Sequence, residues 1–162
     1  MKEITLTKGR IALIDDDDFE LVMQYKWFYR TKGYAWRLQR KGEPKPRSQQ
    51  SMHRLIMGCP EGYHIDHING DKLDNRRSNL RTCTRQQNAS NMSIRKNNKT
   101  GLKGVCKQGN SYVAYIKQNY KTIYLGSYKS PEEAAAAYDS AATERFGNFA
   151  RPNSRQNERN SK

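Results

Sequence analysis

The segment His64–Asp71 combines side chains that can bind a metal ion with one that can move a proton. Asp66 and His67 stand side by side, and two amides, Asn79 and Asn88, follow at later positions. An imidazole titrates near neutral pH and can take a proton from water, whereas carboxylate and amide oxygens are hard ligands suited to Mg²⁺ or Mn²⁺. Hydrolysis of a phosphodiester uses both functions. The segment therefore predicts metal-assisted cleavage of a phosphodiester.

Each of these residues can be given a role. Asp66 and Asn88 are predicted to hold one divalent cation, Mg²⁺ or Mn²⁺, and His67 is predicted to act as the general base. Asn79 is predicted to accept a hydrogen bond from the far ring nitrogen of His67, which would fix the tautomer. His64 shares a strand face with Asp66. It is either an extra ligand or phosphate contact, or an ordinary half-buried histidine.

The chain carries a large excess of positive charge. Its 162 residues include 30 Lys and Arg against 16 Asp and Glu, a net charge of +14. This excess favours a polyanionic partner, and double-stranded DNA is expected. A solvated basic surface is the alternative. No segment has the apolar length of a membrane span and no secretory signal is visible, so we expect a cytoplasmic protein without a membrane partner, a monomer or weak dimer.

The first fifty residues predict a β-rich extension. Residues 4–14 alternate as a hairpin does. The acidic run at residues 15–18 could suggest a metal site, but consecutive carboxylates cannot all face one ion. Asp17 or Asp18 is predicted instead to cap a helix from Phe19 to about Trp27. Further segments are a strand at residues 34–38, a loop at 41–50 and an apolar segment at 52–57.

The candidate catalytic and metal-binding residues fall on a predicted strand, loop, strand and helix. The first strand covers residues 63–66 and ends at His67, and the second covers residues 80–83. Thr84 and Gln87 form a capping box, so a helix should begin there and carry the last amide of the motif. The end of the first strand lets the acid and the imidazole approach one phosphate from different sides.

The C-terminal part predicts a small sheet with one helix. Strands are expected near Val105, at residues 112–117 and at 122–128, and Ser130-Pro131 begins a helix that Gly147 ends. The predicted domains are an extension at residues 1–50, a nuclease unit at 51–91, a basic linker at 92–101, a sheet-and-helix domain at 102–150 and a flexible tail at 151–162.

The central motif resembles a known family. Asp66-His67, Asn79 within the run SNLR and Asn88 within the run QQN are similar to the HNH motif, in the ββα-metal form of phage and intron homing endonucleases. The resemblance implies the roles given above. It also implies an α+β fold, with a ββα-metal unit next to the extension, and a protein of phage or bacterial host cells. Asn88 stands at a position where imidazole would bind the metal more tightly.

A second resemblance covers residues 103–148. Segments 103–105, 112–117, 123–128 and 133–139 resemble the plant Apetala/ethylene-response-factor domain, in the form appended to phage HNH nucleases. In that family a three-stranded antiparallel sheet lies in the major groove and one helix backs it. Cys106 stands where the plant domains usually have Arg, so their base specificity is not carried over.

Alternation along the strands separates two faces of this sheet. Tyr112, Ala114 and Ile116 are predicted to pack on the helix. The residues predicted to face DNA are Val113, Tyr115, Lys117, Thr122 and Tyr124. The alternative is that this aromatic face packs on the nuclease unit.

Basic residues supply further predicted DNA contacts. Those near the catalytic motif are Arg76, Arg77, Arg81 and Arg85, and those of the linker region are Arg95, Lys96, Lys99 and Lys103. The linker charges are equally consistent with a solvated spacer. The leading interpretation is a homing-type DNA endonuclease; a DNA-binding regulator without catalysis and an RNA-binding protein are the alternatives.

Overall fold

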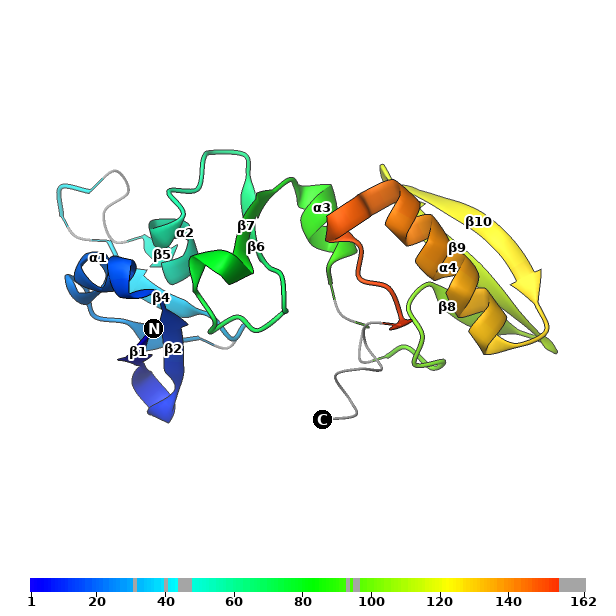
Figure 1. Cartoon of the computed structure of the whole chain (residues 1–162), viewed down its shortest axis with the longest axis horizontal. Helices are drawn as coiled ribbons and strands as arrows, with labels where there is room; N and C mark the ends of the chain where they lie inside the picture. The colour runs from blue at the N-terminus through cyan, green and yellow to red at the C-terminus, as the bar shows by residue number, and fades with distance from the viewer. Residues whose placement is uncertain (31, 40, 44–47, 93, 95–96, 155–162) are drawn as a thin grey trace. The chain divides into compact units, whose positions relative to one another are not determined.

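The structure is a computed structural model that describes residues 1–162 except 31, 40, 44–47, 93, 95–96 and 155–162 (Figure 1). Two predicted DNA contacts, Arg95 and Lys96, lie outside the described residues. The chain divides into two compact units, Met1–Thr84 and Arg85–Lys162, and each is described by itself. Small antiparallel sheets and few helices make up both, which confirms the α+β class.

Among its described residues, the first unit contains three small antiparallel sheets. Strands β1 (Lys2–Thr5) and β2 (Ile11–Ile14) form the predicted hairpin. The second sheet has the order β3 (Phe28–Tyr29), β4 (Ala35–Leu38), β5 (Gln49–Ser51). The third pairs β6 (His64–His67) with β7 (Leu80–Cys83). Two short helices, α1 (Phe19–Met23) and α2 (Met52–Ile56), complete the unit.

One core joins the N-terminal extension to the β6–β7 hairpin. Its buried residues include Ile4 and Ile14 from the first hairpin, Met52 from α2, Ile65 from β6 and Leu80 from β7. Strands of two to four residues bury too little apolar surface to be stable alone. The shared core therefore anchors the strand that carries the candidate chemistry.

Two elements of the first unit differ from the prediction. The helix expected to reach Trp27 ends at Met23, and the Trp27 indole donates a hydrogen bond to the carbonyl oxygen of Val22 at 2.8 Å. Strand β5 forms where a loop was expected, because it pairs with β4 and Gln50 accepts a hydrogen bond from Arg37 Nε at 2.9 Å. At β5, strand pairing overrides local propensity.

The predicted cap of α1 is confirmed in position, since Asp18 is the N-cap residue, but not in its side-chain bond. Asp17 lies within a short 3-10 helix, Asp16–Asp18, and Asp18 makes no side-chain capping bond. The Asp18 carboxylate is instead buried and accepts hydrogen bonds from Nε and Nη2 of Arg77 at 2.9 and 2.7 Å. A buried carboxylate requires a strong partner, and the guanidinium supplies it.

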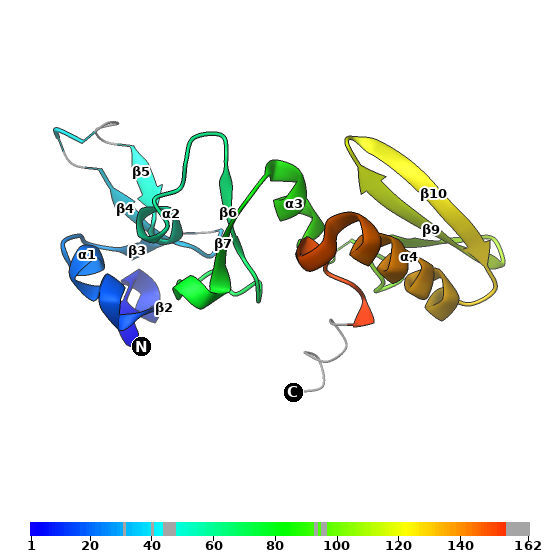
Figure 2. The ribbon, with the colours of Figure 1, turned by 45° about the horizontal axis from the view of Figure 1, so that its top comes forward.

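The second unit is a three-stranded antiparallel sheet backed by a helix. Its strands are β8 (Val105–Gln108), β9 (Ser111–Gln118) and β10 (Lys121–Tyr128), with β9 in the centre. Figure 2 shows α4 (Pro131–Phe146) running along one face of this sheet. A short helix, α3 (Arg85–Ser90), precedes them. The predicted capping box of α4 is confirmed, since Ser130 Oγ accepts from the Glu133 amide at 3.2 Å.

Packing in the second unit follows the predicted alternation with one exception. Ala114 and Ile116 are buried against the α4 side, as expected. Val113 was expected to face DNA but is only 3% exposed, because Cys106 and Ser127 flank it on the neighbouring strands. Gly104 is required at its position: a Cβ there would lie 2.0 Å from the Tyr138 ring.

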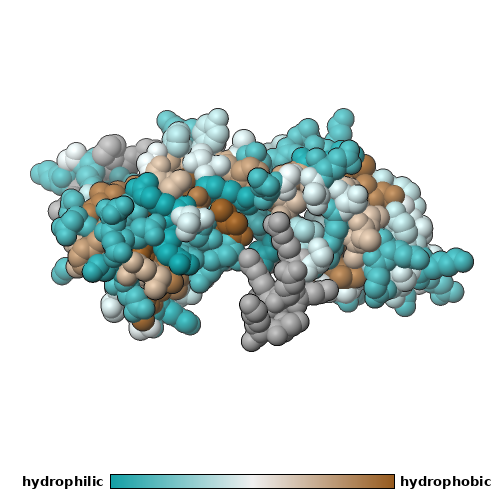
Figure 3. All heavy atoms as spheres, viewed as in Figure 1, coloured by the Kyte–Doolittle hydropathy of each residue, from teal (hydrophilic) through white to brown (hydrophobic). Residues whose placement is uncertain are grey.

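The surface is largely hydrophilic, as expected for a chain with 28% charged residues. Figure 3 shows hydrophilic residues over most of the visible face. Within the described residues no helix is both long and apolar enough to cross a membrane.

Candidate active site

The β6–β7 hairpin places an acid opposite a basic residue. Its register pairs Asp66 with Arg81 and His67 with Leu80. Because cross-strand partners share a sheet face, Arg81 reaches Asp66, and its Nε and Nη2 donate to Oδ2 at 2.9 and 2.7 Å. Both side chains are largely buried, with 7% of Asp66 and 17% of Arg81 exposed. The predicted metal ligand Asp66 is thus paired with Arg81, which was itself predicted to contact DNA.

His67 lies in a cluster of rings. Its ring centroid is 5.0 Å from that of His53 and 5.8 Å from that of Tyr34, and the Tyr34 and His53 centroids are 5.2 Å apart. Ser51 Oγ lies 3.0 Å from Nε2 of His53. His67 itself is only 5% exposed. Tyr34 and His53 therefore pack around the predicted base, His67, and we call the three residues the ring cluster.

Burial lowers the pKa of His67, because a charged imidazole loses hydration there. A side-chain interaction with Asn75 opposes this effect. Weaker opposition comes from three carboxylates, those of Asp66, Asp71 and Asp74. Burial also lowers the pKa of His53 to about 3, with contributions from His67 and Arg54. Both rings are therefore neutral near pH 7, and a neutral imidazole is the form that accepts a proton.

Asn79 holds the loop that follows His67. Its Oδ1 accepts from the Asn69 amide at 2.9 Å, and its Nδ2 donates to the carbonyl oxygen of Asp74 at 2.8 Å. The Asn79 carbonyl oxygen accepts from the Ile68 amide at 2.9 Å. These bonds fix the backbone on both sides of the loop. A direct bond from Asn79 to the His67 ring stays a prediction.

Two predicted DNA contacts form ion pairs within the first unit. Arg76 donates through Nε and Nη2 to the Asp74 carboxylate at 2.7 Å each, and this pairing lowers the pKa of Asp74. Arg77 binds Asp18, as described above, and also donates to the carbonyl oxygen of Ile56 at 3.0 Å. Both guanidinium groups therefore stabilise loop geometry near the candidate site, and their contact with DNA stays a prediction.

The remaining residues of the motif lie in different settings. His64 is exposed at the start of β6. Asn88 is partly exposed on α3, and Arg85 is exposed at the start of the same helix. Since α3 belongs to the second unit, a metal ion shared by Asp66 and Asn88 stays a prediction. Across the part of the chain that the structure describes, no three His, Cys, Asp or Glu side chains gather as a metal site would require.

Four of the predicted DNA-facing residues come together on the sheet face opposite α4. Tyr115 pairs with Tyr124 and Lys117 with Thr122 across β9 and β10. The two tyrosine rings are in edge contact, with centroids 5.7 Å apart, and Tyr124 is 59% exposed. We call these four residues the sheet patch.

Two lysines predicted to bind phosphate differ in exposure. Lys99 is exposed. Lys103 is partly buried, and its amine donates a hydrogen bond to the carbonyl oxygen of Ser90. Burial lowers the pKa of Lys103 to about 8, with a smaller contribution from Arg151.

Three residues beside His67 were not predicted from the sequence. Tyr34 lies just before β4, His53 lies in α2, and Asn75 lies in the loop between β6 and β7. His53 and Asn75 did have a sequence signal, since the flanking segments 52–57 and 74–77 also resemble HNH nucleases.

Comparison with known proteins matches the segment that carries this candidate site. A family model described as HNH endonuclease matches residues 52–90. An uncharacterized HNH endonuclease of Acanthamoeba polyphaga mimivirus is 33% identical over 152 residues, which cover 90% of this chain and 76% of that protein. Protein 3.8 of Escherichia phage T7 is 46% identical over 46 residues, 28% of this chain and 38% of that protein.

The match to the mimivirus protein spans most of both sequences, and the family model covers β6, β7 and α3. The chain belongs to the HNH endonuclease family. It is accordingly a nuclease, an enzyme that hydrolyses phosphodiester bonds of DNA, and HNH nucleases generally use a divalent metal.

Proposed function

We propose that this chain is a metal-dependent endonuclease of the homing type that cuts double-stranded DNA with one divalent cation, Mg²⁺ or Mn²⁺. The observation that carries the proposal is the pair Asp66 and His67 at the end of β6. Asp66 forms an ion pair with Arg81, and burial lowers the pKa of the His67 ring below its ordinary value. A carboxylate and a neutral imidazole are the two groups that metal-assisted hydrolysis needs from the protein.

In this proposal Asp66 and Asn88 would hold the cation, which supplies charge stabilisation at the phosphate when bound. The Asp66 carboxylate suits that role, because it already binds a positive group and is held by a buried hairpin. His67 takes a proton from the attacking water. Asn79 acts on His67 through the loop it holds, and Asn75 through its interaction with the ring.

The second unit is proposed to bind duplex DNA as the Apetala/ethylene-response-factor resemblance implies. Support comes from the sheet patch, where two tyrosines, Lys117 and Thr122 share an accessible face opposite α4. Aromatic and basic side chains on an open sheet face can contact base edges and phosphates. The net charge of +14 supports the same assignment and predicts binding that weakens steeply with salt.

The deciding experiment is cleavage of supercoiled DNA carrying a random-sequence library, with sequencing of the cut ends. The proposal expects cutting in Mg²⁺ or Mn²⁺, none in chelator, and cut sites that share one sequence. Cutting that continues in chelator would contradict metal dependence. Cut sites without a common sequence would contradict the homing type. DNA binding without any cutting would favour the regulator.

A further inference from the structure

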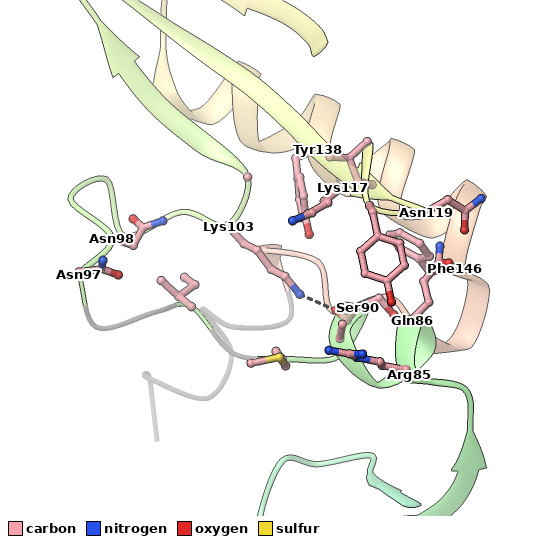
Figure 4. Close-up of a pocket in the computed structure, with 16 residues that line it drawn as sticks. Arg85, Gln86, Ser90, Asn97, Asn98, Lys103, Lys117, Asn119, Tyr138 and Phe146 are labelled. Atoms are coloured by element: carbon pink, nitrogen blue, oxygen red, sulfur yellow. Dashed lines mark hydrogen bonds between the residues drawn. The ribbon is translucent and has the colours of Figure 1, made fainter. Parts of the chain in front are cut away.

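The second unit contains a cavity that the nuclease chemistry does not use and that shares only Lys117 with the sheet patch. Its volume is about 630 Å³, and it lies between α3, the end of β9 and helix α4. Figure 4 shows Lys117 and Tyr138 on one side of it and Arg85 and Gln86 on the other. The volume is within the range of about 300–1,000 Å³ typical of small-molecule sites.

The charges around this cavity are of one sign. Arg85, Lys103 and Lys117 line it, and none of its described lining residues is an Asp or Glu. The nearby acid, Asp139, accepts hydrogen bonds from the Asn153 amide at 2.6 Å and from the Ser154 amide at 3.0 Å. With three cations in the lining and one acid nearby, a ligand with an anionic group would therefore meet a net positive charge.

The neutral part of the lining combines rings with amides. Tyr120, Tyr138 and Phe146 supply aromatic surface, and Gln86 and Asn119 supply hydrogen-bond donors and acceptors. A planar heterocycle needs both: a ring face for stacking and amides for its polar edge. Together with the cations, this lining favours a ligand that joins a heterocycle to a phosphate.

Tyr120 is unusual in two ways. It is 82% exposed, and its φ of 63° lies in the left-handed region, next to Asn119 with φ 49°. A tyrosine is strained in that region, where glycine would fit a two-residue hairpin turn without cost. Strained backbone and an exposed ring at the rim of a cavity point to a binding role for the residue.

We propose that this cavity binds one unstacked nucleotide of DNA, with its base against Tyr120 and its phosphate toward Arg85, Lys103 and Lys117. The inference rests on the proposed DNA-binding function of the second unit and adds a second site that shares Lys117 with the sheet patch. Extrusion of a base costs a few kcal/mol, about the magnitude that stacking on an aromatic side chain can return.

The test uses the whole chain and deoxyadenosine 5′-monophosphate as the probe, with deoxyadenosine and inorganic phosphate titrated separately. Binding is followed by amide NMR shifts of Lys103, Gly104 and Lys117. Ala89, an exposed residue of α3 that lines the cavity, is changed to Trp to fill it. Ala136→Trp, on the exposed face of α4, is the matched control.

The inference expects shifts with the nucleotide that saturate at least tenfold more tightly than with nucleoside or phosphate. It expects Ala89→Trp to weaken them at least tenfold and Ala136→Trp to leave them unchanged. Equal binding of phosphate and nucleotide, or equal shifts in both variants, would overturn it. Loss of the site with retained duplex binding and cleavage would leave the proposed function intact, whereas loss of those activities in the unmodified chain would remove the proposed function itself.

Discussion

The Asp66 carboxylate and the Arg81 guanidinium form an ion pair across the β6–β7 hairpin, with both hydrogen bonds directed to Oδ2. The pair lies next to His67, the predicted base. Any cation that binds Asp66 must therefore share or displace the guanidinium. Arg81 is the residue that competes with the metal in the proposed site.

Replacing Arg81 should separate metal binding from stability. Arg81→Gln is expected to tighten Mn²⁺ binding about five- to tenfold, because a charge-assisted pair of roughly 1–1.5 kcal/mol no longer opposes it. It should lower the melting temperature in chelator, since a buried carboxylate loses its partner. Mn²⁺ titration by electron paramagnetic resonance and thermal unfolding measure the two effects. Arg76→Gln, which breaks the pair with Asp74, is the control, and unchanged Mn²⁺ affinity in Arg81→Gln would contradict the competition.

Removing the imidazole should affect chemistry and not binding. His67→Ala is expected to lower the cleavage rate by roughly 10²–10⁴, the usual contribution of a general base. DNA affinity should stay nearly unchanged. Single-turnover cleavage and DNA binding in Ca²⁺ provide the two measurements. A comparable fall in affinity would mean that His67 is a structural residue of the ring cluster.

Asn79 should act through the loop. Asn79→Ala removes the bonds to the Asn69 amide and the Asp74 carbonyl, so unfolding free energy should fall by about 1–3 kcal/mol and the cleavage rate should fall as well. Asn79→Asp keeps the acceptor toward Asn69 and should recover part of both. Hydrogen exchange of the Asn69 amide reports the loop directly. A lower cleavage rate without faster exchange of the Asn69 amide would indicate that Asn79 acts directly on the His67 ring.

Arg77 should contribute more to stability than to DNA binding. Arg77→Ala leaves the buried Asp18 carboxylate without its guanidinium, at a cost of about 1–3 kcal/mol in unfolding free energy. Lys99→Ala, at an exposed position, is the comparison expected to leave stability unchanged. Urea unfolding and the salt dependence of DNA affinity distinguish the two. If Arg77→Ala left the unfolding midpoint unchanged and made DNA affinity less dependent on salt, Arg77 would instead be a phosphate contact.

Acid should destabilise the first unit through His53. Its pKa in the folded chain is about 3, below the ordinary value of 6.5, so the unfolded chain takes up the proton first. This contribution to stability is complete above pH 6.5 and is lost as pH falls toward 3, which amounts to about 2 kcal/mol by pH 5. Urea unfolding at pH 7.5 and 5 measures it. His53→Gln should flatten the dependence, and the exposed His64→Gln should retain it; a steep dependence in His53→Gln would assign the effect elsewhere.

The sequence alone determined the parts that depend on local order. The alternation around Lys8-Gly9 predicted the first hairpin, and Ser130-Pro131 with Glu133 predicted the start of α4, because turns and caps are formed by residues close together in the chain. The motif from Asp66 to Asn88 identified the family for the same reason, since its spacing is a property of the chain itself.

Only the tertiary structure decided which partners these residues bind. Arg81 and Arg77 look like free cations in the sequence, yet register brings one to Asp66 and the shared core brings the other to Asp18, 59 positions away. His53 and Tyr34 reach His67 from distant segments in the same way. Burial makes such partners necessary, because a charged group removed from water needs an ion pair or hydrogen bonds from neighbouring groups, and these neighbours also shift its pKa.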